Sequence, residues 1–328
     1  MNATAGCDLD SSAGKIFAAT FYGGVFLLGL PLNCLVLWAM APQLKTEQCL
    51  PVFSASLLAS NLLLLVTLPL GLTYLLHHSP WTLGSAVCTL VRAAFFLHLF
   101  ASVLFLTWIS VVRYVAVGHP LRFAAFQSSR GGCLSCATLW LLALALCATG
   151  AFLVPSQGHG NGNRSYCFRT HPMPPDYAVF RLVTSVLFYI LPCLTLGTMY
   201  VLIQRTLWGA ASVQAVERER ITTMIAVVVA GFALLYGPYH AVECYRCIAV
   251  LLRRDICSVE RALFLPDRIT LAVSTLTAVL IPVFYIVSAK KVRQRIRHGP
   301  ANPGQQQVPH FLPSSIPVPR PSALNCQS

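Results

Sequence analysis

Charged residues are scarce in this sequence. Only 10% of its 328 residues are Asp, Glu, Lys or Arg, and 56% are hydrophobic. A soluble domain carries roughly 25% charged residues. So few charges cannot cover a globule that faces water, and this excludes an ordinary soluble domain.

Several signatures of other membrane functions are also missing. The chain has no H-E-x-x-H, no G-x-S-x-G and no paired Asp in facing apolar stretches, so we expect no enzyme and no cofactor or metal. It shows no internal repeat, which argues against a repeat-built transporter. Only Asn33, Asn61 and a few hydroxyl residues are polar in the middle of these stretches, which argues against a channel. The two amides are expected to bond to other helices.

The net charge of +13 does not indicate nucleic acid, because the basic residues gather at the ends of apolar stretches instead of forming a basic stripe. Membrane lipids with anionic headgroups are the simpler partner.

Seven stretches are long and apolar enough to cross a bilayer, which takes about 20 helical residues each. We therefore predict an all-α membrane protein, a seven-transmembrane helix bundle followed by a short amphipathic eighth helix. Pro69, Pro192, Pro238 and Pro282 are expected to kink their helices. The predicted spans are 16–40, 50–76, 88–115, 133–154, 178–205, 219–249 and 262–288.

The chain divides into an extracellular head (1–15), the bundle (16–288), a cytoplasmic amphipathic helix (289–299) and a disordered cytoplasmic tail (300–328). The tail is too poor in apolar periodicity to fold. Positive charge marks the cytoplasmic side of a plasma-membrane protein, so the basic segment after the last span places the C-terminus inside. Glycosylation sequons at Asn2 and Asn163 then lie outside. The basic residues are Lys290, Lys291, Arg293, Arg295 and Arg297.

Every span carries a short recognisable element, and together they resemble the rhodopsin-like (class A) G-protein-coupled receptors over nearly all of residues 16–298. Within that family the chain is most similar to the proton-sensing and lysolipid-responsive subgroup, in residues 119–124 and 237–240 and in Cys7 facing Cys257. The family elements are Asn33, Asn61, Trp81-x6-Cys88, Arg113-Tyr114, Trp140, Pro192 with Tyr200, Phe232-x5-Pro238, and Pro282 with Tyr285.

The resemblance implies two disulfides, Cys88 with Cys167 and Cys7 with Cys257. It also implies a heterotrimeric G protein as partner, with arrestin as a further candidate. The residues expected to meet the G protein are Arg113, Tyr114, Tyr200 and Tyr285.

Three positions depart from the family pattern. Val112 stands where members usually carry an acid, Asn61 where they carry Asp, and Ile281 where they carry Asn or Asp. Sodium prefers carboxylate and other hard oxygen ligands, so we predict no sodium site. The same departures leave an alternative open: a receptor-fold protein with atypical or no G-protein signalling, acting as a decoy or partner chaperone. The missing acid at Ile281 also weakens a proton-sensing function.

Four arginines lie near the outer ends of four predicted spans. The planar guanidinium matches carboxylate or phosphate, so we expect an anionic ligand, lipid-like where aromatic residues line a cavity below. Alternatively the arginines pair with acids such as Asp267, and the aromatics are ordinary core. His98 and His240 titrate near physiological pH, which makes the proton the other candidate ligand. The expected ligand-binding residues are Arg92, Phe95, Phe96, Arg181, Tyr239, His240, Glu243, Arg246 and Arg268.

Overall fold

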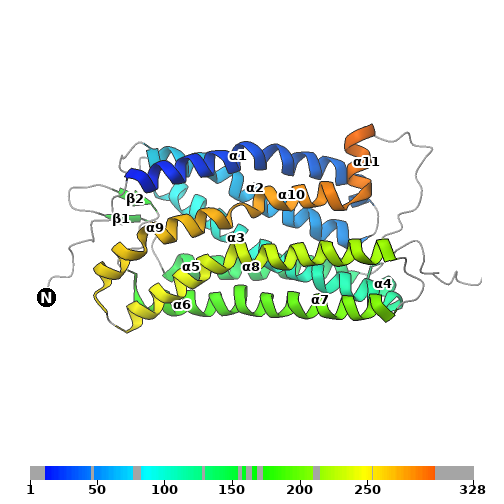
Figure 1. The fold of residues 1–328 in the computed structure, drawn as a ribbon. Helices are drawn as coiled ribbons and strands as arrows, with labels where there is room; N and C mark the ends of the chain where they lie inside the picture. Colours follow the sequence, from blue (N-terminus) through cyan, green and yellow to red (C-terminus); the bar gives the residue numbers. More distant parts are fainter. Residues whose placement is uncertain are drawn as a thin grey trace, which may run out of the picture.

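The protein was analysed as a computed structural model. It describes residues 12–45, 48–76, 83–127, 130–153, 157–159, 165–167, 173–209, 215–252 and 254–299. Within these ranges, seven segments are long and apolar enough to cross a membrane. They lie side by side in one elongated bundle (Figure 1), which confirms the predicted fold. The head, the tail, both sequons and Cys7 fall outside the described residues, wholly or nearly so, and remain predictions.

The first four spans are single helices, whereas the fifth and seventh are each built from consecutive pieces. The first four are α1 (Ser12–Met40), α2 (Cys49–Leu76), α3 (Gly84–Gly118) and α5 (Arg130–Leu153), with η1 (Gln43–Lys45) and α4 (Pro120–Gln127) in the connections. The fifth comprises α6 (Pro175–Ser185), η2 (Val186–Ile190) and α7 (Leu191–Gly209). The remainder are α8 (Ala215–Leu251), α9 (Ile256–Ser274), α10 (Thr277–Ser288) and the short helix α11 (Lys290–His298).

The two ends of the bundle differ in what covers them. Strands β1 (Gln157–His159) and β2 (Ser165–Cys167) pair antiparallel at the end where α1 begins. Helices α4 and α11 lie at the opposite end (Figure 1). We call these the hairpin end and the α11 end. At the hairpin end, Cys88 of α3 forms a disulfide with Cys167 of β2, with Cα atoms 5.7 Å apart. This confirms the first predicted disulfide.

A π-helical segment, η2, widens the fifth span immediately before Pro192. The N–H of Leu191 bonds to the carbonyl of Val186, five residues back. Proline has no N–H, and in an α-helix its ring clashes with the carbonyl four residues back. The wider turn gives Pro192 room, and the helix continues beyond it.

The seventh span, predicted as one helix, is divided between α9 and α10. The N–H groups of Thr275 and Leu276 bond to carbonyls three residues back, at 3.0 and 3.1 Å. The hydroxyls of Ser274, Thr275 and Thr277 also bond to preceding carbonyls. Short hydroxyl side chains compete for helix carbonyls in this way, which loosens the regular ladder.

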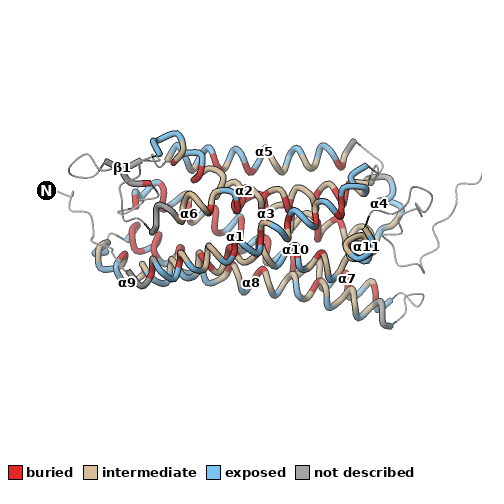
Figure 2. Tube along the Cα trace, turned by 90° about the horizontal axis from the view of Figure 1, so that it is seen from above, coloured by how far each residue is buried: buried red, intermediate tan, exposed pale blue. Residues whose placement is uncertain are grey.

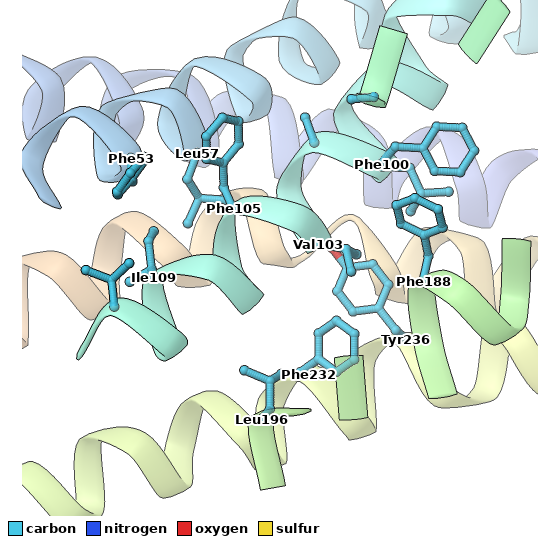
Figure 3. Close-up of a cluster of buried hydrophobic side chains, with 14 of the residues drawn as sticks. Phe53, Leu57, Phe100, Val103, Phe105, Ile109, Phe188, Leu196, Phe232 and Tyr236 are labelled. Carbon is cyan, nitrogen blue, oxygen red and sulfur yellow. The ribbon is translucent and has the colours of Figure 1, made fainter. Parts of the chain in front are cut away.

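The core lies between α2, α3 and the helices that face them. Figure 2 shows buried residues along α2 and α3, whereas α5 is mostly exposed. Figure 3 shows side chains of α2, α3, η2, α7 and α8 pointing toward one another, including Phe105, Phe188 and Tyr236. The outer faces carry large apolar side chains such as Phe152, 87% exposed, and Leu234, 72% exposed. Such faces require lipid as their solvent.

Two buried amides join three helices in the middle of the bundle. Asn33 of α1 donates to the carbonyls of Gly29, at 2.8 Å, and Ala278, at 2.7 Å. Asn61 of α2 donates to Asn33 Oδ1 at 3.1 Å. Both amides are fully buried. The prediction that each bonds to another helix is confirmed.

Candidate functional site

A buried ion-pair network joins α6, α8 and α9 at the hairpin end. Arg181 of α6 donates from Nε to Oε1 of Glu243 on α8 at 3.1 Å, and its Nη2 lies 3.0 Å from the same oxygen. The other carboxylate oxygen of Glu243, Oε2, lies 3.6 Å from Nη1 of Arg246. One glutamate therefore stands between two arginines, and it is much closer to Arg181.

Arg246 is surrounded by three carboxylates. Besides Glu243, it lies 3.5 Å from Glu260 and 3.7 Å from Asp267, both on α9. Glu260 is 1% exposed and Arg246 is 5% exposed. Buried charges are costly unless they are paired, so this arrangement holds α9 against α8. Within the network three acids face two arginines, because Arg181 and Glu243 belong to it as well.

Aromatic residues complete the surroundings of Arg181. The Tyr239 hydroxyl accepts a hydrogen bond from the Arg181 guanidinium. That guanidinium also lies 5.8 Å from the centre of the Phe96 ring and 5.7 Å from that of Tyr239. Cations are attracted to aromatic faces at such distances. Arg181, Phe96, Tyr239 and Glu243 thus form one cluster, as their joint prediction as ligand-binding residues requires.

The other predicted ligand residues are placed differently. Arg92 is buried on α3, beside Ala93, whose carbonyl accepts from the Cys147 thiol of α5. Arg268 lies 5.4 Å from the centre of the Phe264 ring, and in the described residues it forms no ion pair with the acids of the network. Phe95 packs on the opposite side of α3 from the network, against residues of α1 and α2. The four arginines therefore do not form a single ring.

The alternative explanation for the arginines and aromatics accounts for part of the set. Arg181 and Arg246 are paired with acids. The aromatics Phe188, Phe232, Tyr236 and Tyr239 belong to the main core cluster. Tyr236 is held there by contacts of its hydroxyl with Ser102, at 3.4 Å, and Thr277, at 3.3 Å.

The two deep histidines are both buried beside neutral groups. Nδ1 of His98 lies 3.0 Å from the carbonyl oxygen of Ser60 on α2. Nδ1 of His240 lies 3.1 Å from Ser185 Oγ at the end of α6, and its ring stacks on Tyr189 with centres 5.0 Å apart. His240 therefore packs between the fifth and sixth spans, close to Pro238.

At the α11 end, the residues predicted to couple to G protein lie on three different spans. Arg113 is half-buried near the end of α3, while its neighbour Val112 points into the core. Tyr114 packs on Ile203 and Leu207 of α7. The Tyr285 hydroxyl of α10 donates to Ser54 Oγ of α2 at 2.8 Å.

Two further contacts at this end concern the fifth and sixth spans. Tyr200 of α7 accepts from Gln204, one turn later, at 2.8 Å. Arg220 near the start of α8 donates from Nη2 to the carbonyl of Ser288, the last residue of α10, at 2.9 Å. Arg220 was not among the predicted residues. It joins the sixth span to the seventh at the end where a G protein is expected.

Glu260 was also missed by the sequence analysis, which started the seventh span at residue 262. Asp255 caps the N-terminus of α9 by accepting from the N–H of Ser258 at 3.5 Å. An aspartate before an apolar run is a helix start signal. Had this signal been used, Glu260 would have been placed on the helix, one turn from its start and able to reach Arg246.

A membrane bundle of seven helices, with a disulfide from the third span to the following loop, defines a seven-transmembrane receptor. The sequence matches the 7 transmembrane receptor (rhodopsin family) over residues 32–285. The chain therefore belongs to the rhodopsin family of G-protein-coupled receptors, which are multi-pass plasma-membrane proteins that respond to small molecules.

Relatives within the family show which members the chain is similar to. Human purinoceptor 4 is 31% identical over 295 residues, covering 89% of this chain and 80% of that receptor. The human uracil nucleotide/cysteinyl leukotriene receptor is 29% identical over 293 residues, covering 88% and 78%. Neither name refers to protons or lysolipids, so the narrower resemblance to that subgroup remains a prediction.

Proposed function

We propose that this receptor responds to an extracellular organic anion that carries a phosphate or a carboxylate, and that it signals through a heterotrimeric G protein. The observation that carries this proposal is the buried network around Arg181 and Arg246 at the hairpin end. Guanidinium groups held among aromatic side chains provide directional donors for such anions.

The hairpin end is the extracellular end in this proposal. The five basic residues of α11 and the three acids of the network support this orientation, because positive charge concentrates on the cytoplasmic side. The helix α11 presents Arg293 and Arg297 beside the membrane surface, where anionic lipids attract basic residues.

The phosphate group is the chemistry that the candidate ligands share. A lysophospholipid and a nucleotide both carry it, and the name of one relative refers to a uracil nucleotide and a leukotriene. The proton is the competing ligand, because His240 lies between the fifth and sixth spans beside Pro238. Ligand binding at the hairpin end shifts the population toward a state in which the sixth span swings about Pro238. Arg113 and Tyr285 are then exposed to the G protein, and arrestin can use the same opening.

Substitutions should separate the anion from the proton. Replacing Arg92, Arg181 or Arg246 by alanine removes a charge-assisted contact of about 1.5–3 kcal/mol. The potency of an anion that uses this contact should fall roughly ten- to a hundredfold. A proton response should survive and should instead shift or vanish in His240→Phe, which keeps an aromatic ring but cannot titrate between roughly pH 5 and 8.

The measurement is G-protein activation in cell membranes that contain each variant at matched surface level. The probes are uridine triphosphate, oleoyl lysophosphatidic acid and a pH series. Arg261→Ala, an exposed arginine on α9, is the control for loss of a positive charge at this end. An agonist whose potency ignores the arginines and His240 alike would place the ligand elsewhere. Absence of any G-protein response, basal or stimulated, would favour the decoy or partner-chaperone alternative.

A further inference from the structure

We infer that Glu243 is a built-in counter-anion, which occupies Arg181 in the resting receptor and is displaced from it by the ligand. The inference rests on the proposed function, because it requires an anionic ligand. It adds which arginine receives the ligand, which group must leave, and what charge the ligand must carry.

The positions of the two carboxylate oxygens of Glu243 make this exchange feasible. Oε1 lies 3.0 Å from Arg181, whereas Oε2 lies 3.6 Å from Arg246, on the same helix as Glu243. When a ligand takes Arg181, the glutamate can close the remaining gap to Arg246 by a small side-chain movement. Glu243 then remains paired, so the large penalty for an uncompensated buried carboxylate is avoided.

The same geometry identifies Arg181 as the arginine that receives the ligand. Arg246 already has Glu260 and Asp267 in addition to Glu243, so an anion placed on it would meet three carboxylates. Among the described ion pairs of Arg181, by contrast, Glu243 is the single acid. Arg246 is therefore a positioning residue, which holds α9 and gives Glu243 its second place.

Displacement of Glu243 also explains how binding reaches the sixth span. The Arg181–Glu243 pair joins α6 to α8, and Glu243 lies five residues after Pro238 on α8. Exchange replaces this pair between two helices by a pair within α8, because Arg246 is on α8 as well. The ligand thus removes a direct attachment between the fifth and sixth spans at the moment it binds.

The exchange selects the charge of the ligand. A monocarboxylate offers Arg181 the same group as Glu243, but it must also give up its translational freedom in solution, so it competes poorly. A phosphate monoester or polyphosphate carries close to two negative charges near neutral pH and three acceptor oxygens. The favoured ligand class is therefore a phosphate-bearing dianion or polyanion, whether nucleotide or lysophospholipid.

The test compares Glu243→Gln with the unmodified receptor in whole-cell membranes. The probes are uridine triphosphate, oleoyl lysophosphatidic acid and oleate, the last two differing in headgroup on the same acyl chain. Glu243→Gln should raise basal G-protein activation. It should increase the potency of the active phosphate probe about tenfold, and it should narrow the preference over a monocarboxylate. Asp176→Asn, an exposed acid in the first turn of α6, controls for loss of a negative charge at this end.

A second variant covers a failure of Glu243→Gln to reach the cell surface. Arg181→Gln combined with Glu243→Gln removes both charges while it keeps side chains of similar reach. It should raise basal activation and abolish the response to phosphate probes. Because the pair is replaced by two neutral amides, no unpaired buried charge remains between them to destabilise the fold.

Each outcome separates this inference from the proposed function. If a phosphate probe acts through Arg181 but Glu243→Gln changes neither its potency nor the basal signal, the inference is wrong and the proposed function stands. If Glu243→Gln loses potency as Arg181→Ala does, Glu243 assists the ligand and the inference is again wrong. If no anionic probe acts on any variant, the anionic ligand is refuted. A raised basal signal in Glu243→Gln would then still support the attachment between α6 and α8.

Discussion

Replacing both cysteines of the Cys88–Cys167 disulfide by alanine should lower the stability of the receptor and abolish its response to ligand. The double substitution is preferable to a single one, because it leaves no unpaired thiol. Both half-cystines are buried, with Cys88 0% and Cys167 2% exposed, so the bond is also shielded from solvent. The bond is the covalent connection between the hairpin and the start of α3.

The magnitude follows from the length of chain that the bond restrains. Two residues separated by 79 positions close a loop whose restraint is worth about 4.5 kcal/mol in the chain-entropy relation. If the spans stay inserted, only the segment of about 14 residues from the end of α5 at Leu153 to Cys167 gains freedom, and the relation gives about 3 kcal/mol. Even the lower value favours the detached hairpin by roughly a hundredfold relative to the intact receptor.

The assay is thermal unfolding of the solubilised receptor together with surface level and ligand response in cells. Cys133→Ala is the matched control, since Cys133 is a free, exposed cysteine on α5. It should behave as the unmodified receptor. A double variant that melts at the same temperature and keeps full surface level and response would show that the disulfide does not hold the hairpin end together.

Two further predictions concern the interior of the bundle. Sodium should have no measurable effect on thermal stability or agonist affinity, because Asn61 and Ile281 replace the usual acid and amide; Asn61→Asp with Ile281→Asn should lower basal signalling, and a sodium dependence of the unmodified receptor would refute this. Gly237→Ala should cost roughly 1–3 kcal/mol, since a methyl group there would lie 2.6 Å from the Tyr189 hydroxyl. Thermal unfolding measures that cost, and adding Tyr189→Phe should recover part of it; if the double variant is no more stable, the hydroxyl is not what the methyl group meets.

The number and order of the spans could be predicted because a bilayer imposes a length and a polarity on every helix. Six predicted spans start or end within a few residues of the observed helices, and the seventh starts six residues late. The internal irregularities were missed. The π-helical turn before Pro192 and the division at Thr275 depend on how individual carbonyls are satisfied, which hydrophobicity does not report. Helix α4 is too short for an apolar pattern to reveal.

The candidate site could be predicted in composition but not in connection. Arg181, Tyr239 and Glu243 were all expected near the outer end, and the structure brings them together. Which acid faces which arginine depends on the rotation of each helix about its axis, and charged residues near a helix end constrain that rotation weakly. Arg268 and Phe95 were therefore grouped with residues from which the bundle separates them.

The paired amides of Asn33 and Asn61 have a consequence for how the receptor senses the cell that carries it. Moving one elementary charge through the whole membrane potential changes the free energy by about 2.3 kcal/mol per 100 mV. A carboxylate at position 61 would sit deep within that field, whereas an amide hydrogen-bonded to a second amide carries no charge for the field to act on. Depolarisation of the membrane therefore acts on this receptor through groups near its two ends, which cross little of the field. In an excitable cell its resting state should change little during an electrical impulse.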